Sequence, residues 1–453
     1  MTDNSKNNGN LSLGKRHSKV ISAMDRRLGP TENIYCFLDK LYCLNFVCFA
    51  EISGSLTLDR INEALHVVQQ EQPLLRARLE LMDDRYWFKP VKSKDFPLRA
   101  EVAAFKDWRK AIAAQLDTPF SGNAPLARFF LFGGRGKKSV AAMVFHHAIA
   151  DGKSGANILL EILRRAGGEE MPMRYQRAHP SAQDLDLIKS KSPLLGSLQK
   201  LRYWLNQGKS ALKFVKQLPG FDMRVRPSRD IHMIPFEVSA KTSSAILTAC
   251  RAHGTTVHGA LGAAQVLAIN DEFETRAERN LALNSLADLR GVLTDNLTEF
   301  DLGLYVATLT TVHEIATEPD FWSLAIDIRA QLKGILQSGD GNLVHGVYSE
   351  TRPFPPTKRG AQMLHAVTAM APSASMLTNI GKVDALTLAD GTQIDSVAFA
   401  VTGPTLHPIC VTATTYANRM YVNVVYDRLK LTENQALRIT KSIRRWLDYA
   451  AKG

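Results

Sequence analysis

Apolar residues along the chain recur with two periods, one typical of strands and the other of helices. Apolar runs rich in aromatic and β-branched residues predict strands, at 44–54, 125–134, 139–147, 233–240, 281–290, 301–315 and 378–386, with two more inside 411–427. Apolar residues three or four apart predict helices, at 107–116, 156–168, 241–254, 255–270 and 431–452, with one more inside 55–79 that Thr57 or Asp59 can cap and Pro73 ends.

Both halves of the chain mix helices and strands, and no short repeat is present. This pattern predicts an α/β (α+β) protein, and 453 residues correspond to about two to three domains. Residues 168–230 differ from the rest, because they are rich in Pro, Ser, Arg and Lys. We therefore expect four parts: a disordered segment at 1–16, an N-terminal subdomain at 17–180, a basic helical linker at 181–230 and a C-terminal subdomain at 231–453.

The charge of the chain is concentrated in one stretch. The formal net charge is +12, and residues 189–229 hold ten Lys and Arg residues against one acidic residue, Asp222. Leucines three, four and seven residues apart predict an amphipathic helix at 194–217. Such a helix can make peripheral contact with an anionic membrane, bind an acidic partner or pack on the protein body, and we favour packing over direct insertion. Aromatic residues are not interleaved with the charges as in a nucleic-acid interface, so no nucleic acid is expected.

Composition also bears on the compartment. Five cysteines are present without a C-x-x-C pair, which favours reduced core thiols over a zinc ribbon or a redox motif. The first residues lack an apolar signal region, and no run of about 18 apolar residues predicts a transmembrane helix. We expect a cytoplasmic protein, with peripheral membrane contact through 194–217 as the alternative.

The candidate chemistry lies in FHHAIADG, residues 145–152. Adjacent residues of a strand face opposite sides of a sheet, so His146 and His147 are poorly placed to share a metal ion. A zinc site also needs three or four ligands, and no H-x-x-x-H or H-E-x-x-H lies nearby, so we expect no metal. A histidine at a strand end can instead act as a general base, and Gly152 allows close approach of a ligand to the backbone. The structural alternative is a pair of buried, hydrogen-bonded core histidines.

FHHAIADGKSG resembles the H-H-x-x-x-D-G signature of the acyltransferase superfamily related to chloramphenicol acetyltransferase. Members of that superfamily include condensation domains of nonribosomal peptide synthesis, plant alcohol acyltransferases, wax ester synthases and polyketide-associated acyltransferases. Further segments resemble the family in the same order: GSLTLDRINEALHVVQQEQPLLRARL, GTTVHGALGAAQVLAI, NSLADLR and LTNIGKVD. The resemblance implies two chloramphenicol-acetyltransferase-like domains, each a mixed sheet with flanking helices, with an active-site tunnel between them.

The resemblance also implies a role for each matching residue. His147 would be the catalytic base, Asp151 would pair with Arg290 rather than relay protons, and the Gly152 N–H would help to hold the oxyanion. His146 would support the loop. Thr378 and Asn379 would lie near the tunnel wall, although a turn at a strand end explains them nearly as well. We interpret His258 as a core or tunnel-lining residue.

The implied reaction is transfer of an acyl group from a thioester to an acceptor hydroxyl, which forms an ester. The donor would be acyl-CoA or an acyl carrier protein, so coenzyme A or phosphopantetheine is a co-substrate and no bound cofactor is expected. Amide formation by a free-standing condensation enzyme, with an amine acceptor, and a non-catalytic binding protein stay open as alternatives. The Pro-Leu-Trp segment of wax ester synthases and the plant D-F-G-W-G segment are absent, and the N-I-G segment favours a free-standing O-acyltransferase.

Overall fold

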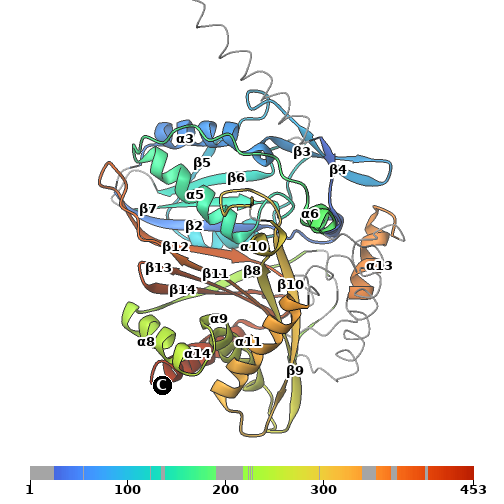
Figure 1. The fold of residues 1–453 in the computed structure, drawn as a ribbon, viewed down its shortest axis with the longest axis vertical. Coiled ribbons are helices and arrows are strands. Elements are labelled where there is room, and N and C mark those ends of the chain that lie inside the picture. Colours follow the sequence, from blue (N-terminus) through green and yellow to red (C-terminus); the bar gives the residue numbers. More distant parts are fainter. Residues whose placement is uncertain are drawn as a thin grey trace, which may run out of the picture.

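The computed structural model describes residues 25–189, 218–338, 354–368 and 375–453, except for 55, 123, 134–137, 223, 225, 227, 295 and 404–406. Two large sheets lie one above the other in Figure 1, each with helices on its outer side. The basic helix expected at 194–217 lies outside the described residues, as does the segment 1–16. No described helix is long and apolar enough to cross a bilayer.

The first sheet has five strands. Its order is β12 (Gln393–Val401), β2 (Phe46–Ser53), β7 (Lys138–Phe145), β6 (Ala127–Gly133) and β5 (Ala100–Ala103). Three strand pairs are antiparallel: β12 with β2, β2 with β7, and β7 with β6. Every residue of β7 after Lys138 is buried. The strand β12 comes from the far half of the chain, which nothing in the sequence pattern indicated. It pairs with β2 and covers an edge that would otherwise expose its backbone donors and acceptors.

Helices flank this sheet. Those on the side facing away from the second sheet are α3 (Leu58–Glu71) and α5 (Gly152–Ala166), and α4 (Trp108–Gln115) contacts both β2 and β8 (Ile231–Val238). The helix α3 begins where predicted, because the Thr57 side chain accepts a hydrogen bond from Arg60 N. The helix α5 fits closely against the sheet at Gly155, where a Cβ atom would come within 2.7 Å of Phe46.

The helix α5 begins four residues before the predicted start at 156. Its N-cap is Asp151, whose side chain accepts from Ser154 N. The strand β7 likewise ends at Phe145 rather than at His147, so the two histidines lie in the turn between β7 and α5. The pattern of apolar residues missed both boundaries because the cap and the turn are polar or small residues that belong to neither period.

The second sheet has six strands. Its order is β10 (Val306–Ile315), β9 (Arg279–Asp288), β11 (Ser375–Val383), β13 (Ile409–Tyr416), β14 (Arg419–Asp427) and β8. The strand β11 runs parallel to β9 and β13, and the remaining neighbours are antiparallel. The hairpin between β13 and β14 turns at Ala417 and Asn418, which both take positive φ angles, 47° and 63°.

Four helices cover the lower face of this sheet in Figure 1. They are α8 (Ala240–Ala252), α9 (Val257–Asn270), α11 (Phe321–Gln337) and α14 (Glu433–Ala450). The helix α9 is buried along nearly its whole length, which explains why its sequence is apolar on all sides. The helix α14 lies within the predicted range 431–452, and its N-cap is Thr432, whose side chain accepts from Gln435 N.

Smaller elements complete the fold. A short sheet has the order β1 (Arg26–Arg27), β4 (Arg85–Pro90) and β3 (Ala77–Met82), and the remaining helices are α2 (Pro30–Leu38), the 3₁₀ turn η1 (Pro73–Arg76), α6 (Ala182–Lys189), α10 (Arg290–Leu293) and α13 (Lys358–Thr368). The two large sheets meet at β12, where the side chains of Thr412 and Asn423 both donate to the Phe399 carbonyl, at 2.6 and 2.9 Å. These bonds join the two lobes next to the turn that carries the histidines.

Candidate active site

His147 lies two residues after the end of β7 and is 5% exposed. Its Nδ1 atom is 3.0 Å from the Ala150 carbonyl oxygen. Because a carbonyl oxygen can only accept a hydrogen bond, Nδ1 carries the ring proton and Nε2 carries the lone pair. The ring is thereby held in the tautomer whose Nε2 can remove a proton from another molecule.

Two aromatic rings enclose the His147 imidazole. The Tyr35 ring, on α2, has its centroid 4.5 Å from the imidazole centroid, and the Phe46 ring, on β2, lies at 5.0 Å. Burial among these groups lowers the pKa of His147 to about 4, because the charged imidazolium is poorly solvated there. His147 is therefore neutral at pH 7, which is the form that a general base requires.

His147 lines a cavity of about 100 Å³ between the two lobes. The lining residues come from both sheets and from α5: Phe46, His147, Gly152, Lys153, Leu286, Asp288, Val306, Thr378, Asn379, Ile380, Phe399 and Val401. The structure thus brings His147, Gly152, Thr378 and Asn379 together at one cavity. Asp151, Arg290 and His146 are not among the residues that line it.

Asp151 points away from the cavity and is fully buried. Its Oδ2 atom lies 2.9 Å from Arg290 Nη1 and accepts from Tyr305 N at 3.2 Å, and its Oδ1 atom accepts from Ser154 N. Arg290 also donates to the Thr298 and Asp301 carbonyls. The pairing that the resemblance implied is present, and it joins the first turn of α5 to the second lobe.

His146 has its own partners, and they do not line the cavity. Its Nδ1 accepts from Ala148 N at 3.1 Å, so Nε2 carries the proton and lies 2.6 Å from Asp39 Oδ2. The two histidines therefore hold opposite tautomers in separate surroundings. Among the described residues, no group of three or more His, Cys, Asp or Glu side chains could hold a metal ion.

Gly152 is the first residue of α5, where the helix provides no acceptor for its backbone N–H. A Cβ atom at this position would come within 3.2 Å of both Ile380 and Phe399, so a glycine keeps the cavity open here. On β11, Thr378 is 7% exposed and the Asn379 Oδ1 atom accepts from Gly381 N. His258 does not line this cavity. Its Nε2 atom is 2.9 Å from Ser285 Oγ, and burial lowers its pKa to about 4.

Several residues at the site were not predicted. Lys153 and Asp288 come from different lobes and form an ion pair of 3.2 Å at the cavity. Tyr35 and Phe46 lie more than 100 residues from His147 in the chain. Lys153 and Asp288 lie within the quoted segments FHHAIADGKSG and NSLADLR, whereas Tyr35 and Phe46 carried no signal in the sequence, because they reach the site through helix packing and sheet pairing.

The chain matches the condensation domain family over residues 39–344, and it therefore belongs to that family. It is similar to the nonribosomal peptide synthetase kk1B of Curvularia clavata, with 24% identity over 235 residues. That match covers 47% of this chain and only 2% of the length of the synthetase.

Two solved structures are similar along most of the chain. Polyketide synthase associated protein 5 from Mycobacterium tuberculosis has a TM-score of 0.67 at 15% identity, over 94% of this chain and 98% of that chain. TRI3, the trichothecene 15-O-acetyltransferase from Fusarium sporotrichioides, has a TM-score of 0.71 at 14% identity, over 94% of this chain and 95% of that chain. At these identities the likeness establishes the fold, which consists of two chloramphenicol-acetyltransferase-like lobes.

Proposed function

We propose that this chain is an acyltransferase that moves an acyl group from a thioester to an acceptor hydroxyl, with His147 as the general base. The observation that carries the proposal is the state of His147: a neutral imidazole whose Nδ1 proton is engaged by Ala150 and whose ring lines a cavity between the lobes. Family membership supports acyl or amide transfer in general.

The proposed reaction follows from this geometry. Nε2 removes the proton of the acceptor hydroxyl as its oxygen attacks the thioester carbonyl, and a tetrahedral intermediate forms. The C–S bond then breaks, the thiolate leaves, and it takes the proton from the imidazolium. The Gly152 N–H would donate to the intermediate oxygen, as donors of an oxyanion hole do. A base in position contributes about 10²–10⁴-fold to the rate.

Purified protein incubated with an acyl-CoA library and a panel of alcohols tests the proposal, with product mass as the readout. His147→Gln should lower the rate by about 10²–10⁴-fold. His258→Gln is the matched control, because His258 is also a histidine of lowered pKa but does not line the cavity. Unchanged turnover in His147→Gln would overturn the assignment of the base.

Amide formation is the second candidate, supported by the similarity to a nonribosomal peptide synthetase. The same base would serve an amine, so the structure of the site does not separate the two reactions. A parallel panel of amines does: product from amines alone identifies amide formation. Product from neither panel, with any thioester, would favour the non-catalytic alternative.

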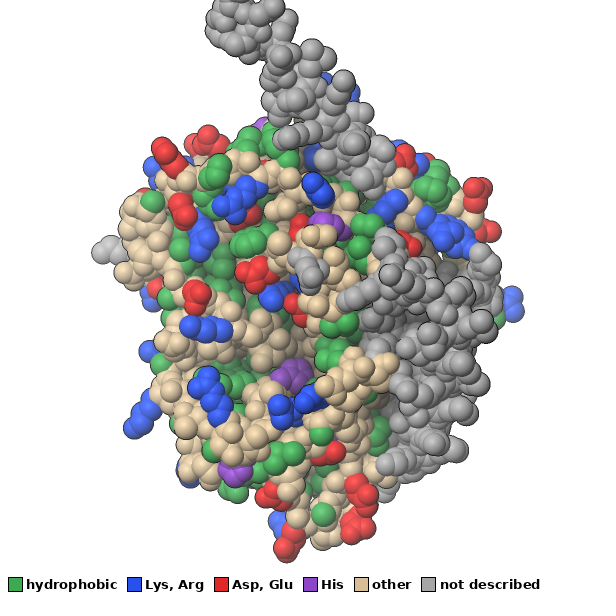
Figure 2. All heavy atoms as spheres, viewed as in Figure 1, with side chains coloured by type: hydrophobic (Ala, Val, Ile, Leu, Met, Phe, Trp, Pro, Cys, Tyr) green, Lys and Arg blue, Asp and Glu red, His purple; other side chains and the backbone are tan. Residues whose placement is uncertain are grey.

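We further propose that the basic stretch at 189–229 steers the donor, because coenzyme A and acyl carrier proteins are both acidic. On the face shown in Figure 2, the described Lys and Arg side chains are interspersed with acidic side chains rather than gathered in one patch. Charge reversal at Lys209, Lys213 and Lys216 should raise the donor KM at low salt. An unchanged KM would contradict this role.

A further inference from the structure

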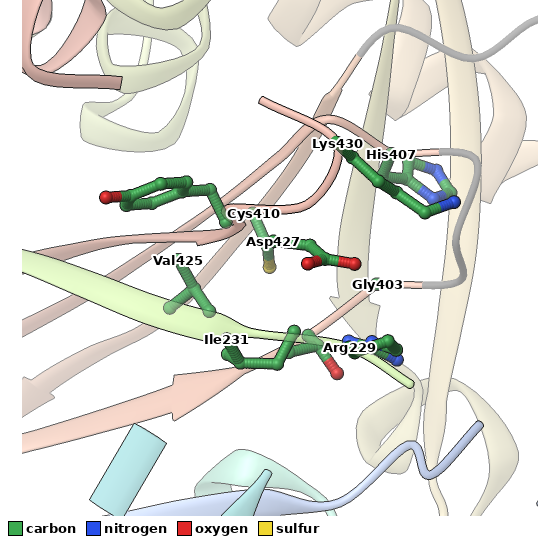
Figure 3. Close-up of a pocket in the computed structure, with 10 residues that line it drawn as sticks. Arg229, Ile231, Gly403, His407, Cys410, Val425, Asp427 and Lys430 are labelled. Carbon is green, nitrogen blue, oxygen red and sulfur yellow. The ribbon is translucent and has the colours of Figure 1, made fainter. Parts of the chain in front are cut away.

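A second, smaller cavity lies in the C-terminal lobe at the ends of β8, β12 and β14, and Figure 3 shows it in close-up. Its volume is about 20 Å³, which is room for one hydroxyl, ammonium or water-sized group. The lining residues are Arg229, Ile231, Thr402, Gly403, His407, Cys410, Val425, Tyr426, Asp427 and Lys430. None of them was predicted as a site residue, and none lines the cavity at His147.

Within the part of the chain that the structure describes, two buried polar atoms of this cavity have no hydrogen-bond partner, Asp427 Oδ2 and Thr402 Oγ1. The Asp427 side chain belongs to a residue that is 8% exposed, and its other oxygen, Oδ1, accepts from Asp230 N and Leu429 N. Figure 3 shows the carboxylate directed into the cavity. Because a buried acceptor without a donor costs about 1–3 kcal/mol, and more when it is charged, this arrangement calls for a donor group from outside the chain.

The cations of the cavity have other partners. Arg229 Nη1 donates to the Cys43 carbonyl at 3.2 Å, and Lys430 Nζ donates to the Arg224 carbonyl at 2.8 Å. His407 contacts the Asn284 side chain on β9. Among the described lining residues, Asp427 Oδ2 and the Thr402 hydroxyl are therefore the buried atoms that lack a partner and can recognise a ligand.

The second cavity and the first have lining residues that lie close together in the chain. On β12, Val401 lines the cavity at His147, and the next two residues, Thr402 and Gly403, line the second cavity. His407 of the second cavity contacts Asn284 on β9, and Leu286, two residues further along the same face of β9, lines the first cavity. Two residues of a strand span about 7 Å, which is within the length of a small molecule that carries two polar groups.

We propose that the second cavity binds a second hydrogen-bond donor of the acyl acceptor, a hydroxyl or an ammonium group, while the reacting hydroxyl lies at His147. The acceptor class is then a diol or an amino alcohol rather than a simple alcohol. This inference rests on the proposed acyl transfer. Asp427 and Thr402 act in it as specificity-determining residues and take no part in the chemical step.

The test compares pairs of acceptors that differ only in the second polar group, such as a diol and the alcohol with hydrogen in place of one hydroxyl. In the unaltered protein the diol should have the higher kcat/KM. Asp427→Asn retains an oxygen for the Asp230 and Leu429 amides but removes the charge. It should lower kcat/KM for the diol by about 10–100-fold, mainly through KM, and leave the simple alcohol unchanged.

Two further variants keep the test decisive. Thr402→Val removes the second unpartnered atom and should act in the same direction if Asp427→Asn fails to fold. Asp230→Asn is the matched control, because its carboxylate pairs with Arg428 and His232 and does not line the cavity. Equal losses for both acceptors, or no preference for the diol in the unaltered protein, would mean that the cavity holds an ordered water only.

A binding measurement separates this inference from the proposed function. The rise in Tm caused by the diol should exceed that caused by the simple alcohol, and Asp427→Asn should abolish the difference. If no acceptor is acylated but this binding difference is present, acyl transfer fails and the recognition site stands. If acylation occurs without any effect of Asp427→Asn on either assay, acyl transfer stands and the recognition site is overturned.

Discussion

At the scale of single residues, the site depends on the unequal surroundings of two adjacent histidines. His146 donates to Asp39, whereas His147 donates to a backbone carbonyl and keeps a lone pair at Nε2. The sequence predicted two compartments from strand alternation alone, and the structure separates the two rings even though both lie just beyond the strand end. The tautomers could not be predicted, because they depend on partners contributed by the turn and by α2.

The pH dependence of catalysis follows from the pKa of His147. A general base works only when unprotonated, so activity falls as the pH drops through its pKa. Burial lowers that pKa to about 4, so we expect the acid limb of kcat/KM to lie well below the ordinary histidine value of about 6.5. A pH–rate profile between pH 4 and 8 measures it. An acid limb at 6.5 would show that water reaches the ring in the working enzyme.

Tyr35 is a positioning residue whose effect should appear in the same profile. Its ring covers the His147 imidazole, so Tyr35→Leu should admit water and move the acid limb upward toward 6.5. Tyr35→Phe keeps the ring and should leave the limb in place, which makes it the matched control. If Tyr35→Leu lowers kcat at every pH without moving the limb, the ring acts in packing alone.

At the scale of elements, the ion pair of Asp151 and Arg290 ties the first turn of α5 to the second lobe. Both side chains are buried, and neither lines the cavity. The pair sets the position of the first turn of α5 and so of Gly152 and the histidine turn. The family resemblance implied this pair, whereas the added contacts with Tyr305 and Thr298 depend on how the chain folds between β9 and β10.

Replacing one member of this ion pair should lower the free energy of unfolding by more than would be expected from replacing both members together. Asp151→Asn or Arg290→Gln alone leaves a buried group without its partner, and we expect each to lower the free energy of unfolding by about 3–5 kcal/mol. The double variant should lose less than the sum of the two. Denaturant unfolding of the unaltered protein, the two single variants and the double variant gives the coupling free energy between the two side chains. Strictly additive losses would contradict a direct interaction.

At the scale of the whole molecule, β12 joins the two lobes. It comes from the second half of the chain, pairs with β2 of the first sheet, and its Phe399 carbonyl accepts hydrogen bonds from two strands of the second sheet. Phe399 and Val401 also line the cavity at His147. One strand therefore pairs into the first sheet, bonds to the second sheet and lines the site between them.

The first lobe should not fold alone, because without β12 the edge of β2 is uncovered. We expect a fragment of residues 25–189 to lack a cooperative unfolding transition. Adding a fragment of residues 218–453 should restore it by supplying the missing strand. Circular dichroism during thermal unfolding measures the transition of the isolated fragment and that of the mixture of the two fragments. A fragment of 25–189 that unfolds cooperatively by itself would contradict this role of β12.

The sequence by itself determined most helices and strands, the histidine turn and its likeness to an acyltransferase signature, because these are local patterns of apolar period, caps and adjacent residues. Only the tertiary structure decided that β12 crosses to the first sheet, that Tyr35 covers His147, and that Asp427 faces a second cavity. Each of these depends on contacts between residues far apart in the chain. A local sequence pattern does not specify which distant residues its segment will contact.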